Sequence, residues 1–402
     1  MPPVVRSMRH HRVELSLRSF RVAGLALCLL PICTLMSGCS RFRPRLADNY
    51  VYVTAKETFL RDRVAAVSNR TATVENGEQL KVLEHGRRFL RVQTEKGVQG
   101  WIDEKVVAPQ DVFDGFSELK KTHQSDPTVA SAVVRDEVYM HMKPGRDTER
   151  LYRLPENEKL QLLTRATLVK PMPPAALQAR ATTSVAKEGA KPAGVPDAPP
   201  PPAMEDWWLV RDSQGHTGWL LSRMMDVDVP EALTRYSEGQ RIVGAYIVAK
   251  VNDPDAPQDD KNIPEYLTVT SPYKAGLPYD FDQARLFIWN VKKHRYETGF
   301  RERNIEGYLP VEITTRKDPA GKTPLAAQAL PAFRYHVLAA DSAPVVPDPV
   351  TGQILPGKTF VKTYRLEGNT VHHLLAPGET SPEEAHPVAP EEKDKKKGKH
   401  RH

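Results

Sequence analysis

An internal repeat constrains the fold of this chain more than any other feature of its sequence. Residues 53–83 align with residues 133–163 at a constant offset of 80, and apolar positions match apolar positions. The alignment resumes at an offset of 118, where Gly100-Trp101-Ile102 matches Gly218-Trp219-Leu220. Self-similarity of this kind predicts two copies of one small structural unit. The change in offset gives the second copy 38 additional residues.

Each copy has the pattern of short β-strands. In Glu78–Val82 polar and apolar residues alternate, which is typical of a half-buried strand. Phe89–Gln93 and Val98–Ile102 predict two more strands, joined by a turn at Glu95–Gly97, because glycine accepts positive φ. Four or five strands in so short a unit favour a small barrel, whose closure hides the strand edges.

Three segments of each copy resemble bacterial SH3-like (SH3b) domains. The segments are Gly77 with Leu80 and Val82, Phe89-Leu90-Arg91-Val92, and Gly97-x-x-Gly100-Trp101-Ile102, repeated as Leu160 with Leu162, Trp208-x-Val210, and Gly215-x-x-Gly218-Trp219-Leu220. The second copy has Asn157 in place of Gly77, and the first lacks the tryptophan expected near Leu90. The resemblance implies binding without chemistry, to wall peptides or protein partners, through a groove between loops.

Four tryptophans are the candidate contact residues of these domains. Trp101 and Trp219 either pack the barrel cores or contact a ligand. Trp207 and Trp208 are neighbours, and neighbours on a strand face opposite sides. We therefore expect one of them to be exposed beside the additional residues or covered by them, and an exposed rim aromatic is a plausible contact. The alternative for all four is core packing.

The additional residues of the second copy coincide with a Pro/Ala-rich stretch. Residues 167–206 contain nine prolines and nine alanines, a composition that buries little and predicts an extended or disordered insertion. The basic tail 377–402 is similarly polar, and it is either a solvated end or a contact for anionic lipid or wall polymer.

The start of the chain predicts export and a lipid anchor. Residues 1–21 hold five arginines and one acid, and the apolar run Val22–Met36 is too short for a bilayer span, which is the pattern of a secretory signal. The segment Leu35-Met36-Ser37-Gly38-Cys39 resembles the bacterial lipobox, with Met36 in place of the usual leucine. That resemblance implies cleavage before Cys39 and lipid on its thiol, and two or more acyl chains anchor a protein stably. The alternatives are an uncleaved anchor helix, and a start at Met8.

Cysteine and charge distributions exclude several function classes. The cysteines are Cys28, Cys33 and Cys39, so the mature chain would keep one thiol, which lipidation would use. This excludes a disulfide framework, a thiol nucleophile and a cysteine metal site. Of the net charge of +7, the signal contributes +4 and residues 391–402 contribute +3. The remaining body is formally neutral and has no concentrated basic face, so we expect no nucleic-acid partner.

The sequence pattern of the region after the repeats also predicts β-strands. Strands are expected at 241–251, 265–271, 286–289, 295–300, 360–366 and 370–375. The charged cluster from Lys292 to Arg303 predicts an exposed hairpin with cross-strand pairs, or else an anion or partner surface. The acids Asp253, Asp255, Asp259 and Asp260 lack the central glycine and terminal glutamate of an EF-hand. We find no catalytic motif and expect no enzyme, metal or cofactor.

These observations together predict an all-β chain with two SH3-like small barrels, a third β-rich, sandwich-like domain, and a disordered insertion and tail. The boundaries are a signal peptide (1–38), a membrane tether (39–49), barrels at 50–111 and 128–228, a third domain at 235–376 and the tail from 377. We expect an envelope lipoprotein that binds peptidoglycan or a wall-associated partner, in the outer membrane facing the periplasm if the source is Gram-negative. The alternatives are an assembly lipoprotein that docks to an envelope complex through residues 235–376, and an enzyme with an unrecognised β-fold.

Overall fold

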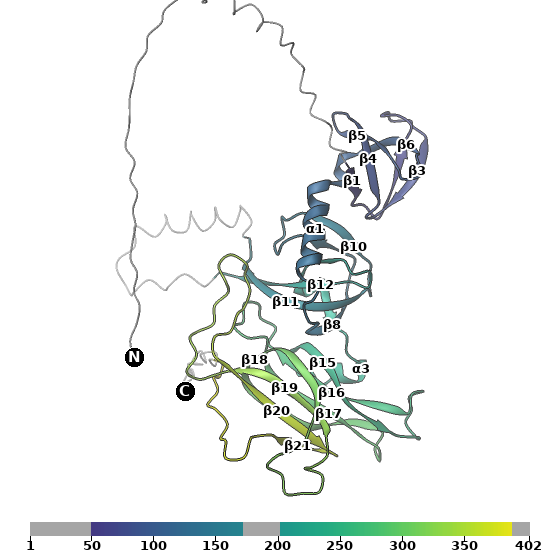
Figure 1. Cartoon of the computed structure of the whole chain (residues 1–402). Helices are drawn as coiled ribbons and strands as arrows, with labels where there is room; N and C mark the ends of the chain where they lie inside the picture. The colour runs from purple at the N-terminus through teal and green to yellow at the C-terminus, as the bar shows by residue number, and fades with distance from the viewer. Residues whose placement is uncertain (1–49, 172–201, 388–402) are drawn as a thin grey trace, which may run out of the picture. The chain divides into compact units, whose positions relative to one another are not determined.

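The computed structural model describes residues 50–171 and 202–387 (Figure 1). Within them, three antiparallel sheets of seven strands each follow one another along the chain. The predicted all-β fold class is therefore confirmed. The predicted signal peptide, Cys39 and the tether lie outside the described residues. No helix in 50–171 or 202–387 is long and apolar enough to cross a bilayer.

The first sheet, with strand order β3-β2-β6-β5-β4-β1-β7, encloses a small apolar core. Its elements are β1 (Tyr50–Val53), β2 (Glu57–Arg61), β3 (Arg70–Glu75), β4 (Gln79–His85), β5 (Phe89–Gln93), β6 (Gln99–Asp103), the one-turn 3₁₀ helix η1 (Glu104–Val106) and β7 (Val107–Pro109).

The second sheet has the equivalent order β10-β9-β13-β12-β11-β8-β14. Its elements are β8 (Ala130–Val134), β9 (Val138–His141), β10 (Arg150–Leu154), β11 (Lys159–Val169), β12 (Met204–Arg211), β13 (Thr217–Leu221), η2 (Ser222–Met224) and β14 (Met225–Val227).

Strand pairing repeats between the two sheets residue by residue. Leu90 pairs with Ile102 in the first sheet as Trp208 pairs with Leu220 in the second, at the offset of 118 found in the sequence. The first strand is the exception: Tyr52 pairs with Gln79 whereas Val133 pairs with Lys159, so β8 is shifted by one residue and its offset is 81.

The repeated glycine before each tryptophan has a steric cause. A Cβ on Gly100 would lie 2.7 Å from the Cβ of Leu60, and one on Gly218 would lie 2.7 Å from the Cβ of Met140. Only glycine lets β6 and β13 cross the neighbouring strands this closely. The Gly-Trp pattern therefore marks a backbone crossing, whatever the tryptophan does.

A helix that the sequence analysis did not predict joins the two sheets. α1 (Gln110–Thr122) buries Val112 and Phe116 in the core of the second sheet. Its Phe113 ring stacks on Tyr52 at 4.0 Å. Tyr52 also belongs to that core cluster, so the two barrels share apolar side chains rather than being joined by a free linker.

The third sheet is a meander in chain order, β15 to β21. The short helix α3 (Glu231–Thr234) precedes it. Its strands are β15 (Arg241–Asn252), β16 (Asn262–Ser271), β17 (Phe281–Asn290), β18 (Arg295–Arg316), β19 (Leu330–Leu338), β20 (Thr359–Glu367) and β21 (Thr370–His373). The six predicted strand segments fall within these strands apart from the last two residues of 370–375, whereas β19 and residues 301–316 of β18 were not predicted.

Parts of the predicted insertion and of the predicted tail form strand pairs. β11 and β12 continue into the 167–206 insertion at both ends, where Thr167 pairs with Asp206. Residues 172–201 lie outside the described residues. At the other end of the chain, Glu384 of the predicted tail forms an isolated bridge with Ala339 and accepts a hydrogen bond of 3.0 Å from Lys362. Residues 388–402 are not described.

Candidate binding site

Three of the four candidate tryptophans are buried, so neither Trp207 nor Trp208 is exposed. Their exposed fractions are 2% and 6%, and that of Trp219 is 6%. The other expectation, that the insertion 167–206 covers one of them, agrees with the packing of Leu168 against the cluster that contains Trp207. Trp208 belongs to the barrel core, whereas Trp207 and Trp219 pack on the other face of the sheet. Leu119 of α1 packs against this outer cluster, so both faces of β12 are covered. Trp101 alone is partly exposed.

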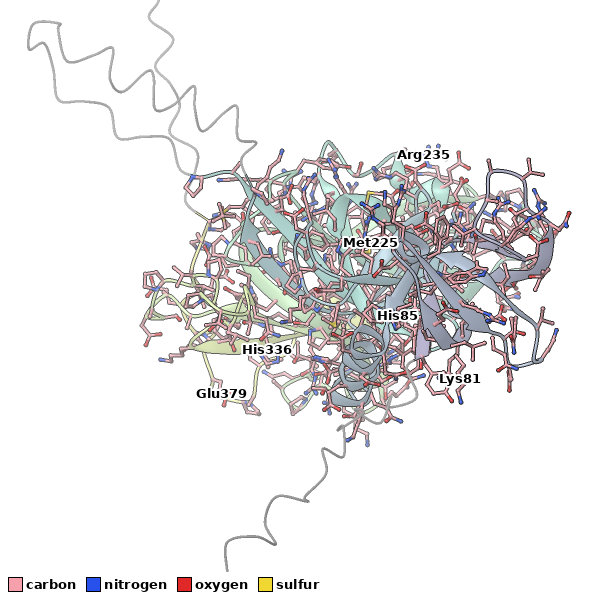
Figure 2. The ribbon with its side chains drawn as sticks, turned by 90° about the horizontal axis from the view of Figure 1, so that it is seen from above. Lys81, His85, Met225, Arg235, His336 and Glu379 are labelled. Carbon is pink, nitrogen blue, oxygen red and sulfur yellow. The ribbon has the colours of Figure 1, made fainter. Side chains whose placement is uncertain are left out.

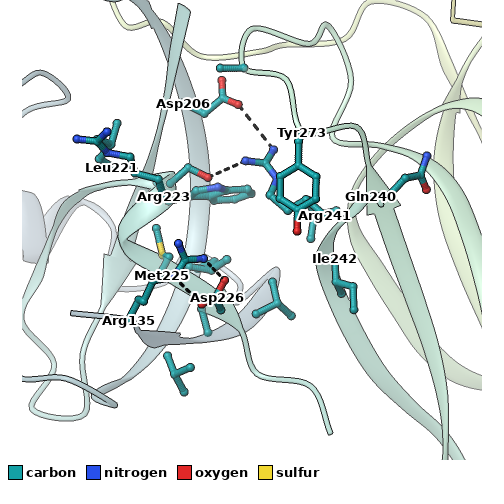
Figure 3. A pocket seen from close by; sticks show the side chains of 18 of the residues that line it. Arg135, Asp206, Leu221, Arg223, Met225, Asp226, Gln240, Arg241, Ile242 and Tyr273 are labelled. Atoms are coloured by element: carbon teal, nitrogen blue, oxygen red, sulfur yellow. Dashed lines mark hydrogen bonds and ion pairs between the residues drawn. The ribbon is translucent and has the colours of Figure 1, made fainter. Parts of the chain in front are cut away.

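A cavity of about 700 Å³ lies between the second barrel and the start of the third sheet (Figure 3). Trp208, Met225 and Val243 are among its apolar lining residues, and polar and charged residues complete the wall. The volume is in the range of sites for small molecules and short peptides. Of the four candidate tryptophans, Trp208 lines this cavity.

A buried ionic network borders the cavity through Asp206. Asp206 on β12 accepts hydrogen bonds from Thr167 (2.8 Å) and from the backbone N–H of Gly276 (3.1 Å). Arg165 lies 3.6 Å from Asp206 and 3.0 Å from Asp280 of the third sheet. These charges are almost inaccessible to water, so each depends on its partners for stability.

Arg241 of β15 extends this network into the cavity wall (Figure 3). It donates a hydrogen bond of 3.0 Å to the hydroxyl of Ser222 and lies 3.8 Å from Asp206. Burial lowers the pKa of Arg241 and the Asp206 carboxylate opposes this effect, but a guanidinium remains charged. The Nε of Arg241 and the Oδ2 of Asp206 are buried without a hydrogen-bond partner. The network therefore has unused donor and acceptor capacity beside the cavity.

The mouth of the cavity carries more accessible groups. Arg135 and Asp226 form a bidentate pair with contacts of 2.5 and 2.9 Å, and the hydrogen bond with Asp226 raises the pKa of Arg135. Arg223 is exposed and has no carboxylate partner among the described residues. Tyr273 has 76% of its surface exposed and projects beside Arg241 in Figure 3. A free guanidinium and a free phenol ring are the residue types that dominate protein recognition sites.

The other charged clusters are satisfied internally. In the segment from Lys292 to Arg303, Glu297 accepts hydrogen bonds from Lys293 and Arg295, while Arg301 and Arg303 bind Glu238. The hydrogen bond from Arg301 lowers the pKa of Glu238 to about 2. The charges of this segment are thus paired partly within the hairpin and partly with Glu238 outside it.

The acidic loop of the third region also has a structural role. Asp253 is buried and accepts hydrogen bonds from the indole of Trp289 (2.7 Å) and from His294 (2.8 Å). Within residues 50–171 and 202–387 there is no group of three or more side chains placed to hold a metal ion.

The residues at the cavity were missed because they come from separate segments. Arg223, Arg241 and Tyr273 lie in no motif, and the sequence alone does not bring them together. One signal was present: Asp206 occupies the position of Arg88 in the first copy, at the offset of 118. A charge reversal at one position of a repeat indicates that the two copies face different surroundings.

Comparisons with known proteins assign no family to the chain. No family model matches it, and no curated protein matches it. An NlpC/P60 family protein from Bacillus cereus is similar over 63% of this chain and 99% of that one, at 9% identity and a TM-score of 0.21. NlpC2 from Trichomonas vaginalis is similar over 78% and 96%, at 8% identity and a TM-score of 0.14. At these TM-scores neither likeness carries an argument about this chain.

Proposed function

We propose that this protein is a lipid-anchored binding protein of the bacterial envelope that holds a carboxylate-bearing peptide of the cell wall in the cavity beside Arg223. The lipobox-like segment ending at Cys39 supports the anchor, and the SH3b-like repeat supports a binding role. Of the expected contact residues only Trp208 lines this cavity, because Trp207 and Trp219 pack on the other face of the sheet.

The unpaired Arg223 at the mouth of the cavity is the observation that carries this proposal. A guanidinium binds a carboxylate through two parallel hydrogen bonds, which gives geometric specificity as well as affinity. Tyr273 offers a ring and a hydroxyl to the peptide backbone, and Trp208 and Val243 line an apolar interior. Wall peptides combine free carboxylates with small apolar side chains, which matches this lining.

Titration calorimetry with soluble muropeptides tests the binding half of the proposal. Arg223→Ala and Tyr273→Ala should each weaken binding by about tenfold or more, as expected for interface residues of these types. Arg316→Ala is the matched control, because Arg316 is exposed at the end of β18, away from the cavity lining. The binding proposal would be overturned if the unaltered chain gave no heat of binding, or if all three variants bound with equal affinity.

Labelling with radioactive palmitate tests the anchor. Cys39→Ser should abolish the label and leave the precursor uncleaved, because no other thiol is present at the cleavage site. Normal labelling of that variant would disprove the anchor without affecting the calorimetry.

A second candidate function, docking to an envelope protein complex, is favoured by the long connection between β19 and β20. Val346, Val350 and Leu355 are exposed there, and exposed apolar groups in one loop indicate a protein contact. Replacing all three with serine should abolish cross-linking to a partner in native envelopes while leaving muropeptide binding unchanged.

A further inference from the structure

The first barrel carries a second cavity, about 490 Å³ in volume, with a different character. It lies between the β2–β3 loop (residues 62–69) and the turn at residues 86–88 that follows β4. His85, labelled in Figure 2, marks the end of β4 next to this turn. The lining residues are Arg63, Val64, Gly86, Arg87, Arg88, Phe89 and Trp101. We call the surface formed by the loop, the turn and Trp101 the arginine–valine face.

The arginine–valine face combines exposed cations with exposed apolar side chains. Arg63, Arg87 and Arg88 are exposed, and Arg87 and Arg88 have no carboxylate partner in the described part of the chain. Val64 is 52% exposed and Val67 is 80% exposed. Isolated valines on a surface need no explanation, but two on one loop surrounded by arginines form an amphipathic patch.

The acid of this loop does not neutralise the patch. Asp62 accepts hydrogen bonds of 2.9 and 3.0 Å from the backbone and side-chain amides of Asn69, which close the base of the loop. Its contact with Arg63 is 4.0 Å, at the limit of an ion pair. The loop therefore has a fixed base and presents its valines and its cations outward.

The second barrel shows why this cavity is open in the first. There, Arg146 in the loop after β9 binds Glu205 near the start of β12 with contacts of 3.0 and 3.1 Å and ties this loop to the strand. The corresponding positions of the first barrel are Ala66 and Arg87, at offsets of 80 and 118. No ion pair can form between them, so the loop and the turn stay apart and leave the ring of Trp101 accessible.

Trp101 lies at the floor of the opening. A Cβ on Gly86 would lie 3.3 Å from the Trp101 ring, so the turn packs directly on the indole without covering it. Tryptophan favours the interface between water and acyl chains, where one end of its ring is apolar and the other is wet. Arginine at the same depth binds anionic phosphate groups.

The arginine–valine face belongs to the barrel that follows Cys39 most closely in the chain, so the tether sets its greatest distance from a bilayer. β1 begins at Tyr50, eleven residues after Cys39, and eleven residues span at most about 40 Å when extended. If Cys39 carries the lipid, as proposed above, the first barrel is held within that distance of the bilayer. We propose that the arginine–valine face docks on the anionic surface of that bilayer, with Val64 and Val67 entering the headgroup layer and the arginines binding phosphates.

Vesicle co-sedimentation of the unacylated chain, residues 40–402, tests this docking. The chain should bind vesicles of phosphatidylglycerol and phosphatidylcholine and bind pure phosphatidylcholine far less. The double change Arg87→Gln with Arg88→Gln should weaken binding by about thirtyfold, from roughly 1 kcal/mol per basic residue near an anionic surface. Val64→Ser with Val67→Ser should weaken it by about tenfold through lost apolar burial.

A matched control removes the same charge from the other end of the barrel. Lys56 and Lys96 are exposed in the turns before β2 and between β5 and β6, at the opposite ends of those strands from the arginine–valine face. Lys56→Gln with Lys96→Gln should leave vesicle binding within about twofold. All variants should keep the melting temperature, since every altered side chain is exposed.

Three results would overturn the docking proposal. They are failure of the unaltered chain to bind anionic vesicles, equal weakening by the lysine pair, and arginine-dependent binding to isolated sacculi with none to vesicles. The last result would assign the face to wall polymer. Because the assay uses a chain without lipid, it can fail while Cys39 labels normally, and it can succeed when labelling fails.

Discussion

The two barrels share one strand framework and differ in what surrounds it. In the first, residues 87–88 are two exposed arginines, whereas the equivalent residues 205–206 of the second are two buried acids. The first barrel leaves Trp101 partly exposed, whereas the second buries Trp219 under residues that include Leu119 of α1. The comparison shows that strand pairing is set by the repeat, while the loops and covering elements decide whether a position is surface or interior.

Replacing the equivalent tryptophans should produce the largest difference between the barrels. Trp219→Ala should destabilise the protein by about 4 kcal/mol, because a fully packed aromatic is lost. Trp101→Ala should cost about 1–2 kcal/mol, since part of that ring is already in contact with water. Urea denaturation followed by circular dichroism measures both, and equal losses would contradict the assignment of different surroundings.

Replacing the oppositely charged residues at the equivalent positions 88 and 206 should produce the next largest difference in stability between the barrels. Asp206→Ala should cost about 3 kcal/mol, because it leaves Arg165 and Arg241 without their shared carboxylate in a buried site. Arg88→Ala should cost less than about 0.5 kcal/mol, as for other exposed side chains. The same denaturation assay applies, and an Asp206→Ala variant of unchanged stability would show that the junction does not hold the barrel and the third sheet together.

The pH dependence of stability should differ between the barrels through His141 and its counterpart, Arg61. Burial, reinforced by the charge of Arg150, lowers the pKa of His141 to about 4. Between about pH 6.5 and 4 the unfolded chain binds a proton that the folded chain does not. Stability is therefore complete above pH 6.5 and falls as the pH drops towards 4.

We expect this loss to reach about 1–2 kcal/mol after allowance for the partial exposure of the ring. His141→Gln should flatten that part of the profile, measured as the urea midpoint against pH, whereas Arg61→Gln should leave its slope unchanged. A slope that persists in His141→Gln would assign the effect to another group.

Substitutions in the turn that contains Gly77 in one copy and Asn157 in the other should change the stability least. Both residues have positive φ, 81° and 64°, which glycine and asparagine tolerate. Asn157→Gly should change stability by less than about 1 kcal/mol, whereas Asn157→Val should cost about 1–2 kcal/mol through backbone strain. Thermal melting distinguishes these outcomes, and an innocuous valine would show that the turn adapts.

The strands of the barrels could be predicted well because the same pattern of apolar residues and glycines occurs in both copies of the repeat. The matched glycines at 100 and 218, with the alternation in Glu78–Val82, locate the strands of both copies from residue pattern alone. The shift of β8 by one residue was missed because Val53 and Val133 are both apolar, so the alignment gave no sign of it.

The sequence left the burial of Trp207 open between alternatives, although it contained a physical reason to expect it. The first copy has Arg91 in the middle of β5, which faces water, whereas the second has Leu209 at that position. A strand apolar on both faces predicts cover on both sides. The helix that helps to provide this cover belongs to neither copy, so repeat matching alone could not identify it.

The contacts around α1 have a mechanical consequence. Asn76 of the first barrel donates a hydrogen bond to the carbonyl of Leu151 and accepts one from the backbone of Arg153, both at 2.9 Å. With the stacking of Tyr52 on Phe113, these contacts couple the barrels at more than one point. A pulling force applied at Tyr50 would therefore act on several contacts between the barrels at once. We expect the two barrels to transmit tension as one rigid unit rather than as two domains joined by a flexible linker.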